Sequence, residues 1–497
     1  MPRHDRVWIN RCQHLSEEIR VERSMRNKFI WLMTLLFLAA SLSADAQAAV
    51  TAFVNVNVIP MDRERVLQNQ TVIVRDGKIT DIGDTAKIKV PKDAVRIDGR
   101  GKYLIPGLMD MHTHLFSDDE FPDNLAGDEF AIMLANGVTT IRLMIGTPEH
   151  LVYREKIAKG EMLGPTLYVA SPEFTGRKGN GVFNGRRVTT PDEARAAVIE
   201  CKVAGYDFIK LTTAITRPVY DAVIETAKEQ GIRVVGHVDT QVGLNRALET
   251  GQHIEHLDSY MEALLKDDAP MKASVSDAGV WRKLNWESLD YVDEKKISEF
   301  AIATAKTGTF TCPTLTFFKL NFVLEQSDDE MRARPDFRFY PKNLQARLFA
   351  AHTRFWTNPP SAERRAKYQR IRNQLVKEIH AAGGKIMAGS DAPELFLVYG
   401  FSLHRELQNL VEAGLQPYAA LAAATRVPAE FLKARDTIGT IERGKRADLV
   451  LLTANPLDNI ANTEKRAGVM VRGRWFADAE LQTMLNGVAG RFQAADH

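Results

Sequence analysis

The chain has 497 residues, 45% of them hydrophobic and 26% charged, which is enough for one large globular domain and a smaller one. Its 65 basic and 63 acidic side chains leave a formal net charge of +2 without a basic stripe, so the composition argues against a nucleic-acid-binding protein. The three cysteines, Cys12, Cys201 and Cys312, lack the spacing of a disulfide framework or a cysteine zinc site. We expect Cys201 and Cys312 to be small buried residues.

The N-terminal residues 1–48 have the pattern of a signal peptide. A basic pair, an apolar core and a small-x-small cleavage site follow one another at Arg26 and Lys28, Phe29–Leu42 and Ala46-Gln47-Ala48. The apolar core is too short to span a bilayer, and Met25 is the expected true start. An uncleaved membrane anchor is the alternative. The protein is exported under both interpretations, so we expect a secreted or periplasmic bacterial protein with no stable membrane span after cleavage.

Short strands are predicted at both ends of the chain. Residues 49–105 contain VTAFVNVNVI, TVIVRDGKITDIG and VRIDGRGKYLIPG, and Asp76-Gly77 between alternating apolar runs indicates a hairpin. Residues 435–490 contain ADLVLLT and GVMVRGRWF. We therefore predict one small composite β-sandwich domain formed by the N- and C-terminal segments.

The middle of the chain, residues 106–434, alternates apolar strands with amphipathic helices. Eight strand candidates occur in this order: LMDMHTH, TTIRLM, TLYVAS, DFIKLT, RVVGHV, HIEHLD, TFTCPTLT and KIMAGSD. Helical stretches lie between them, and Gly205, Gly231 and Gly251 fit helix C-caps. Eight strands each followed by a helix predict an α/β fold of the (β/α)₈ TIM-barrel type.

Residues 319–375 depart from this alternation. They hold many arginines and aromatic residues with few strand signals, which predicts a helical insertion near the seventh strand. The insertion could form a lid or a solvated pair of charged helices.

A histidine pair stands at the end of the first predicted barrel strand. In a strand, residues i and i+2 point to the same face, so His112 and His114 project together. Two neutral imidazoles in this arrangement can chelate zinc, iron, nickel or cobalt.

Four more residues of the ligand type end later strands. They are Lys210 in DFIKLT, His237 in RVVGHV, His256 in HIEHLD and Asp391 in KIMAGSD. Active sites of this fold lie at the carboxyl ends of the strands, so six such residues indicate a metal centre. Any one of them alone would be read as a core histidine or a solvated lysine.

These motifs resemble the amidohydrolase superfamily. The matching stretches are PGLMDMHTHL, IKL, GHV, IEHL and GSDAP, and the tail TIGTIERGKRADLVLLTANPLDNI followed by VRGRW is similar to its composite-domain members. The match extends from about residue 50 to residue 480. It is closest to the imidazolonepropionase-like and Xaa-Pro dipeptidase (prolidase-like) branch, which includes ochratoxin-type amidases.

The resemblance implies two divalent metal ions, with Zn²⁺ expected although other divalent ions accept such ligands. His112, His114 and Asp391 would bind the more buried ion, and His237 and His256 the more exposed one. Lys210 would bridge both ions as a CO₂-derived carbamate, because an ammonium has no acceptor to offer.

The same resemblance implies a mechanism. Two cations about 3.5–4 Å apart lower the pKa of a shared water, and the metal-bound hydroxide attacks the amide carbonyl. Asp391 would take the proton and pass it to the leaving nitrogen.

Three residues are predicted to contact substrate. His404 follows the eighth strand, and Tyr220 and Arg142 lie near strand ends or their loops. Each could also be structural. The basic, glycine-rich residues 174–187 lack the spacing of a phosphate loop and are expected to form a substrate loop.

The sequence thus predicts an exported metal-dependent hydrolase that cleaves the amide (C–N) bond of a small peptide or N-acyl amino acid. The expected partners are a small molecule or short peptide, with no nucleic acid, and homo-oligomers are common in such a family. The alternatives are a mononuclear deaminase or cyclic-amide hydrolase, a lactonase or phosphotriesterase on the same scaffold, and a non-catalytic metal-binding protein. Lys210 favours the binuclear enzyme over the mononuclear one, because mononuclear members generally lack a bridging lysine. A missing ligand or a missing Asp391 would mark a non-catalytic protein, and none is missing, whereas the motifs do not separate an amidase from a lactonase or phosphotriesterase.

Overall fold

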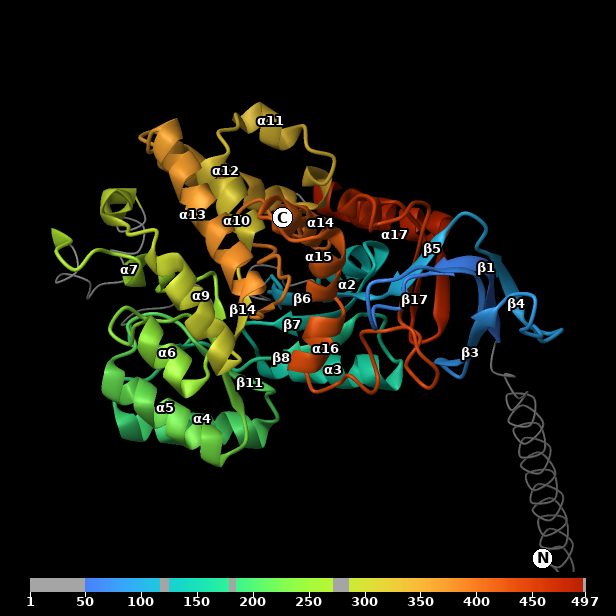
Figure 1. The fold of residues 1–497 in the computed structure, drawn as a ribbon, viewed down its shortest axis with the longest axis horizontal. Coiled ribbons are helices and arrows are strands. Elements are labelled where there is room, and N and C mark those ends of the chain that lie inside the picture. Colours follow the sequence, from blue (N-terminus) through green and yellow to red (C-terminus); the bar gives the residue numbers. More distant parts are fainter. Residues whose placement is uncertain (1–49, 117–124, 178–184, 271–285, 495–497) are drawn as a thin grey trace, which may run out of the picture. The chain divides into compact units, whose positions relative to one another are not determined.

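Strands from the two ends of the chain share one sheet (Figure 1). The computed structural model describes residues 50–116, 125–177, 185–270 and 286–494. Along the sheet the strands are β18 (Arg474–Ala477), β17 (Arg466–Val471), β16 (Leu449–Leu452), β5 (Tyr103–Pro106), β1 (Thr51–Val58), β2 (Leu67–Arg75) and β3 (Lys78–Asp84), with β4 (Val95–Asp98) paired to β1. The two ends join where β5 and β16 pair antiparallel, with Leu449 opposite Pro106.

The predicted hairpin at Asp76-Gly77 joins β2 to β3. Both residues have positive φ, 51° and 72°, as a type I′ turn requires. The side chains of Phe53, Val72 and Leu449 pack in one buried cluster of this sheet. Within the described residues these strands form a single sheet, and the predicted sandwich is not shown.

Eight parallel strands occupy the positions of the eight predicted segments. They are β6 (Leu108–Thr113), β7 (Val138–Leu143), β8 (Thr166–Val169), β11 (Phe208–Leu211), β12 (Arg233–Gly236), β13 (His253–Glu255), β14 (Phe310–Cys312) and β15 (Lys385–Ile386). Parallel pairings connect neighbours in this order, with a single bridge, Ala170 to Phe208, between β8 and β11. A second bridge, Thr113 to Ala392, brings the segment after β15 back to β6. The strand pairing therefore returns to its starting point.

Helices connect most of these strands, as the alternation predicts for an α/β fold. They are α2 (Ala126–Ala135), α3 (Pro148–Lys159), α4 (Pro191–Ala204), α5 (Arg217–Glu229), α6 (Leu244–Thr250), α7 (Tyr260–Ala263), the 3-10 helix η2 (Ser288–Tyr291) and α9 (Lys296–Thr307). Helix α4 begins with a capping box, in which the Thr190 side chain accepts the Glu193 N–H, and ends at the left-handed Gly205. The two short strands β9 (Phe174–Thr175) and β10 (Arg186–Arg187) flank residues 178–184, which lie outside the described residues.

The stretch between β14 and β15 is helical. It comprises α10 (Leu315–Phe318), the π-helix η3 (Lys319–Val323), α11 (Asp328–Arg332), η4 (Phe337–Phe339), α12 (Lys342–Trp356) and α13 (Ala362–Ala381). Some of its charged side chains are internal: Asp336 is buried between Arg334 of this stretch and Arg405 of the later helix α14 (Phe401–Glu412), with N–O distances of 2.9 and 2.8 Å. These side chains hold the helices together and are not merely a solvated surface.

The chain continues through α14 (Phe401–Glu412), α15 (Pro417–Ala423) and α16 (Arg426–Phe431) before β16, then η5 (Ile460–Glu464), and ends in α17 (Asp478–Ala494). Residues Thr51–His497 belong to one unit, and the division at residues 105/106 and 434/435 stays a prediction. The predicted signal peptide, residues 1–48, lies outside the described residues. Among the helices that are described, none is long and apolar enough to cross a membrane.

Candidate metal centre

The six predicted ligand residues line one cavity. Its volume is about 230 Å³, and its wall consists of His112, His114, Ile145, Glu173, Lys210, His237, His256, Phe317, Phe318, Asp391 and Glu394. The six come from the ends of five parallel strands, namely β6, β11, β12, β13 and the segment after β15. Parallel strands end at one edge, so side chains that are far apart in sequence converge there.

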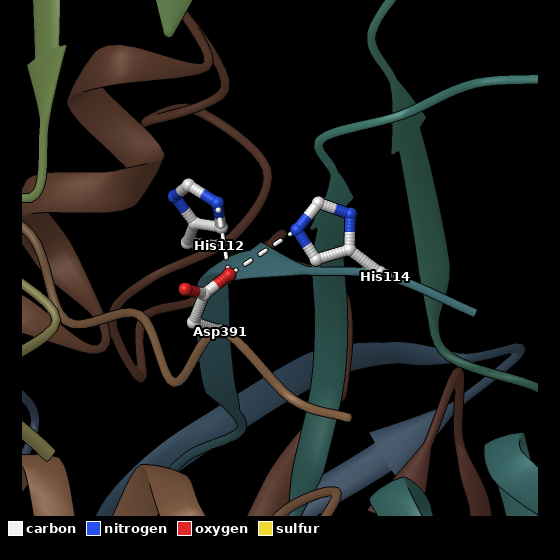
Figure 2. A group of neighbouring side chains, drawn as sticks. All are labelled: His112, His114 and Asp391. Atoms are coloured by element: carbon white, nitrogen blue, oxygen red, sulfur yellow. Dashed lines mark hydrogen bonds and ion pairs between the residues drawn. The ribbon is translucent and has the colours of Figure 1, made fainter. Parts of the chain in front are cut away.

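Three of these side chains form the tightest group (Figure 2). Asp391 Oδ1 lies 3.2 Å from His112 Nε2 and 3.2 Å from His114 Nε2. One donor atom from each residue falls within 4.8 Å of the others. Two imidazole nitrogens and a carboxylate oxygen at this separation fit a divalent metal ion such as zinc.

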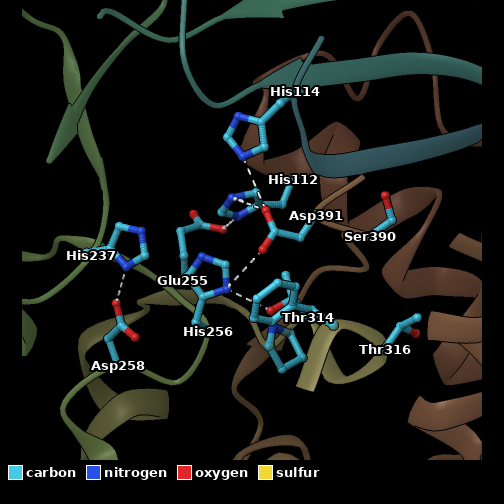
Figure 3. Close-up of polar contacts among 12 residues, drawn as sticks. His112, His114, His237, Glu255, His256, Asp258, Thr314, Thr316, Ser390 and Asp391 are labelled. Carbon is cyan, nitrogen blue, oxygen red and sulfur yellow. Dashed lines mark hydrogen bonds and ion pairs between the residues drawn. The ribbon is translucent and has the colours of Figure 1, made fainter. Parts of the chain in front are cut away.

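His256 faces the second carboxylate oxygen of Asp391, and His237 lies beside His256 (Figure 3). Their rings stack with centroids 4.8 Å apart, and His256 Nδ1 is 3.9 Å from Asp391 Oδ2. A neighbour orients each ring: Asp258 contacts His237 Nδ1 at 2.6 Å, and Thr314 contacts His256 Nδ1 at 2.8 Å. Fixing Nδ1 in this way leaves Nε2 available to a metal.

Burial sets the protonation of the centre. It lowers the pKa of His114 to about 4 and the pKa values of His112 and His256 well below the usual range, so these imidazoles are neutral, as ligands must be. Burial likewise lowers the pKa of Lys210 and raises the pKa of Asp391 to about 7. A lysine with a lowered pKa reaches the neutral amine more easily, which carboxylation by CO₂ requires.

Residues of the centre adopt left-handed backbone conformations. The φ angles of His256, Thr314 and Asp391 are 62°, 45° and 63°. Non-glycine residues rarely adopt such angles, and they concentrate at functional sites where the surrounding fold fixes them. Because φ is positive at His256, the strand alternation stops after Glu255, and both side chains reach the interior.

The three predicted substrate residues lie outside the cavity wall. Buried Arg142 binds Glu255 at 2.7 Å and the Met111 carbonyl at 2.5 Å. The Tyr220 hydroxyl is 2.7 Å from the Thr250 hydroxyl, between α5 and α6.

His404, on α14, also contacts protein groups outside the cavity wall. Its ring nitrogens lie 3.0 Å from the Thr463 hydroxyl and 3.0 Å from the Asn136 carbonyl. The polar atoms of Tyr220 and His404 already contact protein groups, and Arg142 is fully buried with its Nε and Nη2 bound to protein oxygens. The structure therefore gives each of the three residues a structural contact, and their contact with substrate stays a prediction.

Sequence reasoning missed five residues of the wall: Ile145, Glu173, Phe317, Phe318 and Glu394. Glu173 follows the strand TLYVAS by two residues, and Glu394 lies three residues after Asp391. Their positions just beyond strand ends were the available signal. The two phenylalanines are on α10, within the helical stretch whose contribution to the site could not be predicted.

A cavity at the carboxyl ends of parallel strands, lined by four histidines, a lysine and an aspartate, defines a candidate metallohydrolase centre. Residues 103–476 match the amidohydrolase family, and the chain belongs to that family. The resemblance noted in the sequence motifs is thereby confirmed, and membership assigns the chain to the hydrolases.

Three similar proteins illustrate the relationship. An enamidase from Eubacterium barkeri is 30% identical over 174 residues, 35% of this chain and 38% of the enamidase. An imidazolonepropionase from Cupriavidus necator is 26% identical over 285 residues, 46% of this chain and 66% of that protein. The chain thus spans less than two thirds of either relative. The solved structure of a Xaa-Pro dipeptidase with bound methionine shares the fold, with a TM-score of 0.59 and 22% identity over 86% of this chain and 100% of that one.

Proposed function

We propose that the chain is a metal-dependent amidohydrolase that cleaves the amide bond of a small peptide or N-acyl amino acid. The observation that carries this proposal is that His112, His114, Lys210, His237, His256 and Asp391 line a single cavity. Family membership and the amide-related names of the relatives support the bond type.

Divalent ions in such a site acidify water and polarise a carbonyl group. His112, His114 and Asp391 would hold the deeper ion, and His237 and His256 the outer one. Asp391 would also take up a proton at its carboxylate and deliver it to the leaving nitrogen. Phe317 and Phe318 form an apolar part of the cavity wall.

We propose two ions, expected to be Zn²⁺, with Lys210 carboxylated between them. Lys210 supports a two-ion site over the mononuclear alternative, because its side chain is buried, lines the cavity and has a lowered pKa. The returning strand pairing supports a (β/α)₈ barrel. A sandwich built on the terminal sheet, export through residues 1–48 and homo-oligomerisation are further proposals that rest on the sequence pattern and the family.

Metal removal tests the proposed function. Dialysis against a chelator is expected to abolish amide hydrolysis, and added divalent ions are expected to restore it, with two ions bound per chain by elemental analysis. The substrate panel comprises Xaa-Pro dipeptides, N-acyl amino acids, ochratoxin A and lactones. Full amide hydrolysis by metal-free protein would contradict the proposal, and cleavage of lactones alone would favour the lactonase alternative.

The charge of the cavity wall favours one substrate class. Besides the six ligand residues, its described wall holds two carboxylates, Glu173 and Glu394, and three apolar side chains. Among the described residues of the wall, Lys210 is the only lysine or arginine. Carboxylates attract an ammonium group and repel another carboxylate. We therefore propose a short peptide with a free amino terminus ahead of an N-acyl amino acid.

Replacing either glutamate tests this preference. Glu173→Gln and Glu394→Gln are each expected to raise KM for a dipeptide by about tenfold, the size of one partly buried ion pair. KM for the N-acetylated form of the same dipeptide should stay unchanged. Glu155→Gln, at an exposed position on α3, is the matched control. Equal effects on both substrates would show that these carboxylates do not recognise an amine.

A further inference from the structure

A buried ion pair lies beside the metal centre. Arg142 of β7 and Glu255 of β13 are both 0% exposed, and Arg142 Nη2 donates to Glu255 Oε1 at 2.7 Å. Counted along the strand pairings, three strands separate β7 from β13 in either direction. The pair therefore joins opposite strands across the interior.

The second oxygen of Glu255 contacts a metal ligand (Figure 3). Glu255 Oε2 lies 2.8 Å from His112 Nδ1. The ion pair with Arg142 favours the ionised form of Glu255. A carboxylate only accepts hydrogen bonds, so the proton of this contact lies on His112 Nδ1 and Nε2 keeps its lone pair. That Nε2 is the atom 3.2 Å from Asp391 Oδ1.

We propose that Arg142 and Glu255 are positioning residues for the ligand His112. The guanidinium fixes the carboxylate, and the carboxylate fixes both the tautomer and the ring orientation that point Nε2 at the metal. A contact to Met111 O at 2.5 Å also ties Arg142 to the residue before His112. This inference rests on the metal site of the proposed function and adds residues that hold no metal themselves.

A further metal ion, bound between His112, Glu255 and Cys312, is the competing explanation, because their donor atoms also lie within 4.8 Å of one another. The guanidinium of Arg142 already places a positive charge against Glu255. Burial also raises the pKa of the Cys312 thiol well above its usual range, so the thiolate that binds metals is disfavoured. Arg142 therefore serves as the cation of this cluster.

Glu255→Gln is the sharpest single change. Arg142 offers only donors, so the glutamine carbonyl is expected to face Arg142 and its NH₂ group to face His112. The NH₂ group needs an acceptor at Nδ1, which moves the proton to Nε2 and removes the lone pair that binds metal. Loss of such an orienting partner typically weakens metal binding about 10–100-fold.

The experiment measures the affinity of the full chain for Zn²⁺ by chelator competition, alongside the melting temperature of the metal-free protein. Glu255→Gln is expected to bind Zn²⁺ about 10–100-fold more weakly, and its Co²⁺-loaded form is expected to show an altered visible spectrum. The double variant Arg142→Met/Glu255→Leu replaces the whole buried pair with apolar groups, which commonly preserves stability. This double variant should melt near the wild-type temperature but bind Zn²⁺ more weakly than the wild type.

The control is Asp336→Asn, which disrupts a buried acid–arginine cluster outside the cavity. It should lower the melting temperature and leave Zn²⁺ affinity unchanged. Wild-type affinity in the double variant, or an equal loss of affinity in Asp336→Asn, would overturn the inference. If Glu255→Gln fails to fold, the double variant decides. If the wild-type protein binds no divalent ion, the proposed function itself is wrong. If the wild type and the double variant bind Zn²⁺ equally, only the positioning role is wrong.

Discussion

Replacing Asp391 with asparagine is expected to lower turnover by about 10³-fold or more. The change removes the carboxylate charge that lies 3.2 Å from both His112 Nε2 and His114 Nε2, and with it the proposed anionic metal ligand and proton carrier. General acid–base catalysis alone contributes about 10²–10⁴-fold. The measurement is kcat on the best amide substrate, with circular dichroism to verify the fold.

Asp336→Asn again provides the control, because it removes a buried aspartate charge away from the cavity. It should reduce stability and retain kcat. An Asp391→Asn protein that turns over within tenfold of wild type would contradict the assigned proton transfer. Metal content must be measured in both variants, since a missing ion and a missing proton carrier lower kcat for different reasons.

Replacing Lys210 with alanine is expected to reduce the bound metal from two ions to one and to lower activity by about two orders of magnitude or more, because a bridging ligand is lost. Lys210 is buried at the end of β11, so truncation leaves a space of carboxylate size beside the ligands. Short carboxylic acids such as acetate or propionate should occupy it and restore part of the activity. The assay titrates these acids against kcat/KM.

Lys210→Arg is the matched variant for this experiment. It keeps a positive charge but cannot form the carbamate, so neither the second ion nor rescue by acids is expected. Full activity of Lys210→Ala without added acid would contradict the carbamate bridge and leave the mononuclear site as the better description.

The sequence was sufficient to locate the strands and to select six candidate ligand residues that line one cavity, because both obey simple periodic rules. Apolar runs mark the strands, and polar residues at their ends mark the catalytic edge of a parallel sheet. His112 and His114 share a face through the two-residue repeat of a strand. The remaining four residues needed only the strand-end position. The terminal strands were also predicted at the right places. The pattern of a single strand does not tell whether such strands form one layer or two, and the described residues form one sheet where a sandwich was predicted.

Arg142 shows where this reasoning stops. Strand periodicity tells which face a side chain takes, but it does not tell how deep along the strand the side chain lies. Arg142 is fully buried and pairs with Glu255 outside the cavity wall. Glu255 was missed for a related reason: regular alternation would turn it away from the face of His256, and the positive φ of His256 breaks that alternation. Long-range partners such as Thr463 for His404 depend on tertiary packing that local patterns do not encode.

The return of the strand pairing to its origin has a consequence for how the protein is assembled. His114 and Asp391 are 277 residues apart in sequence, and the bridge from Thr113 to Ala392 links the first parallel strand to the last. Contacts between such distant residues form late in folding, because the long intervening chain must be ordered first. The ligand set proposed for the deeper ion would therefore be incomplete in a nascent or truncated chain. Metal binding at this centre would then require the finished fold, so it would serve as a measure of complete folding.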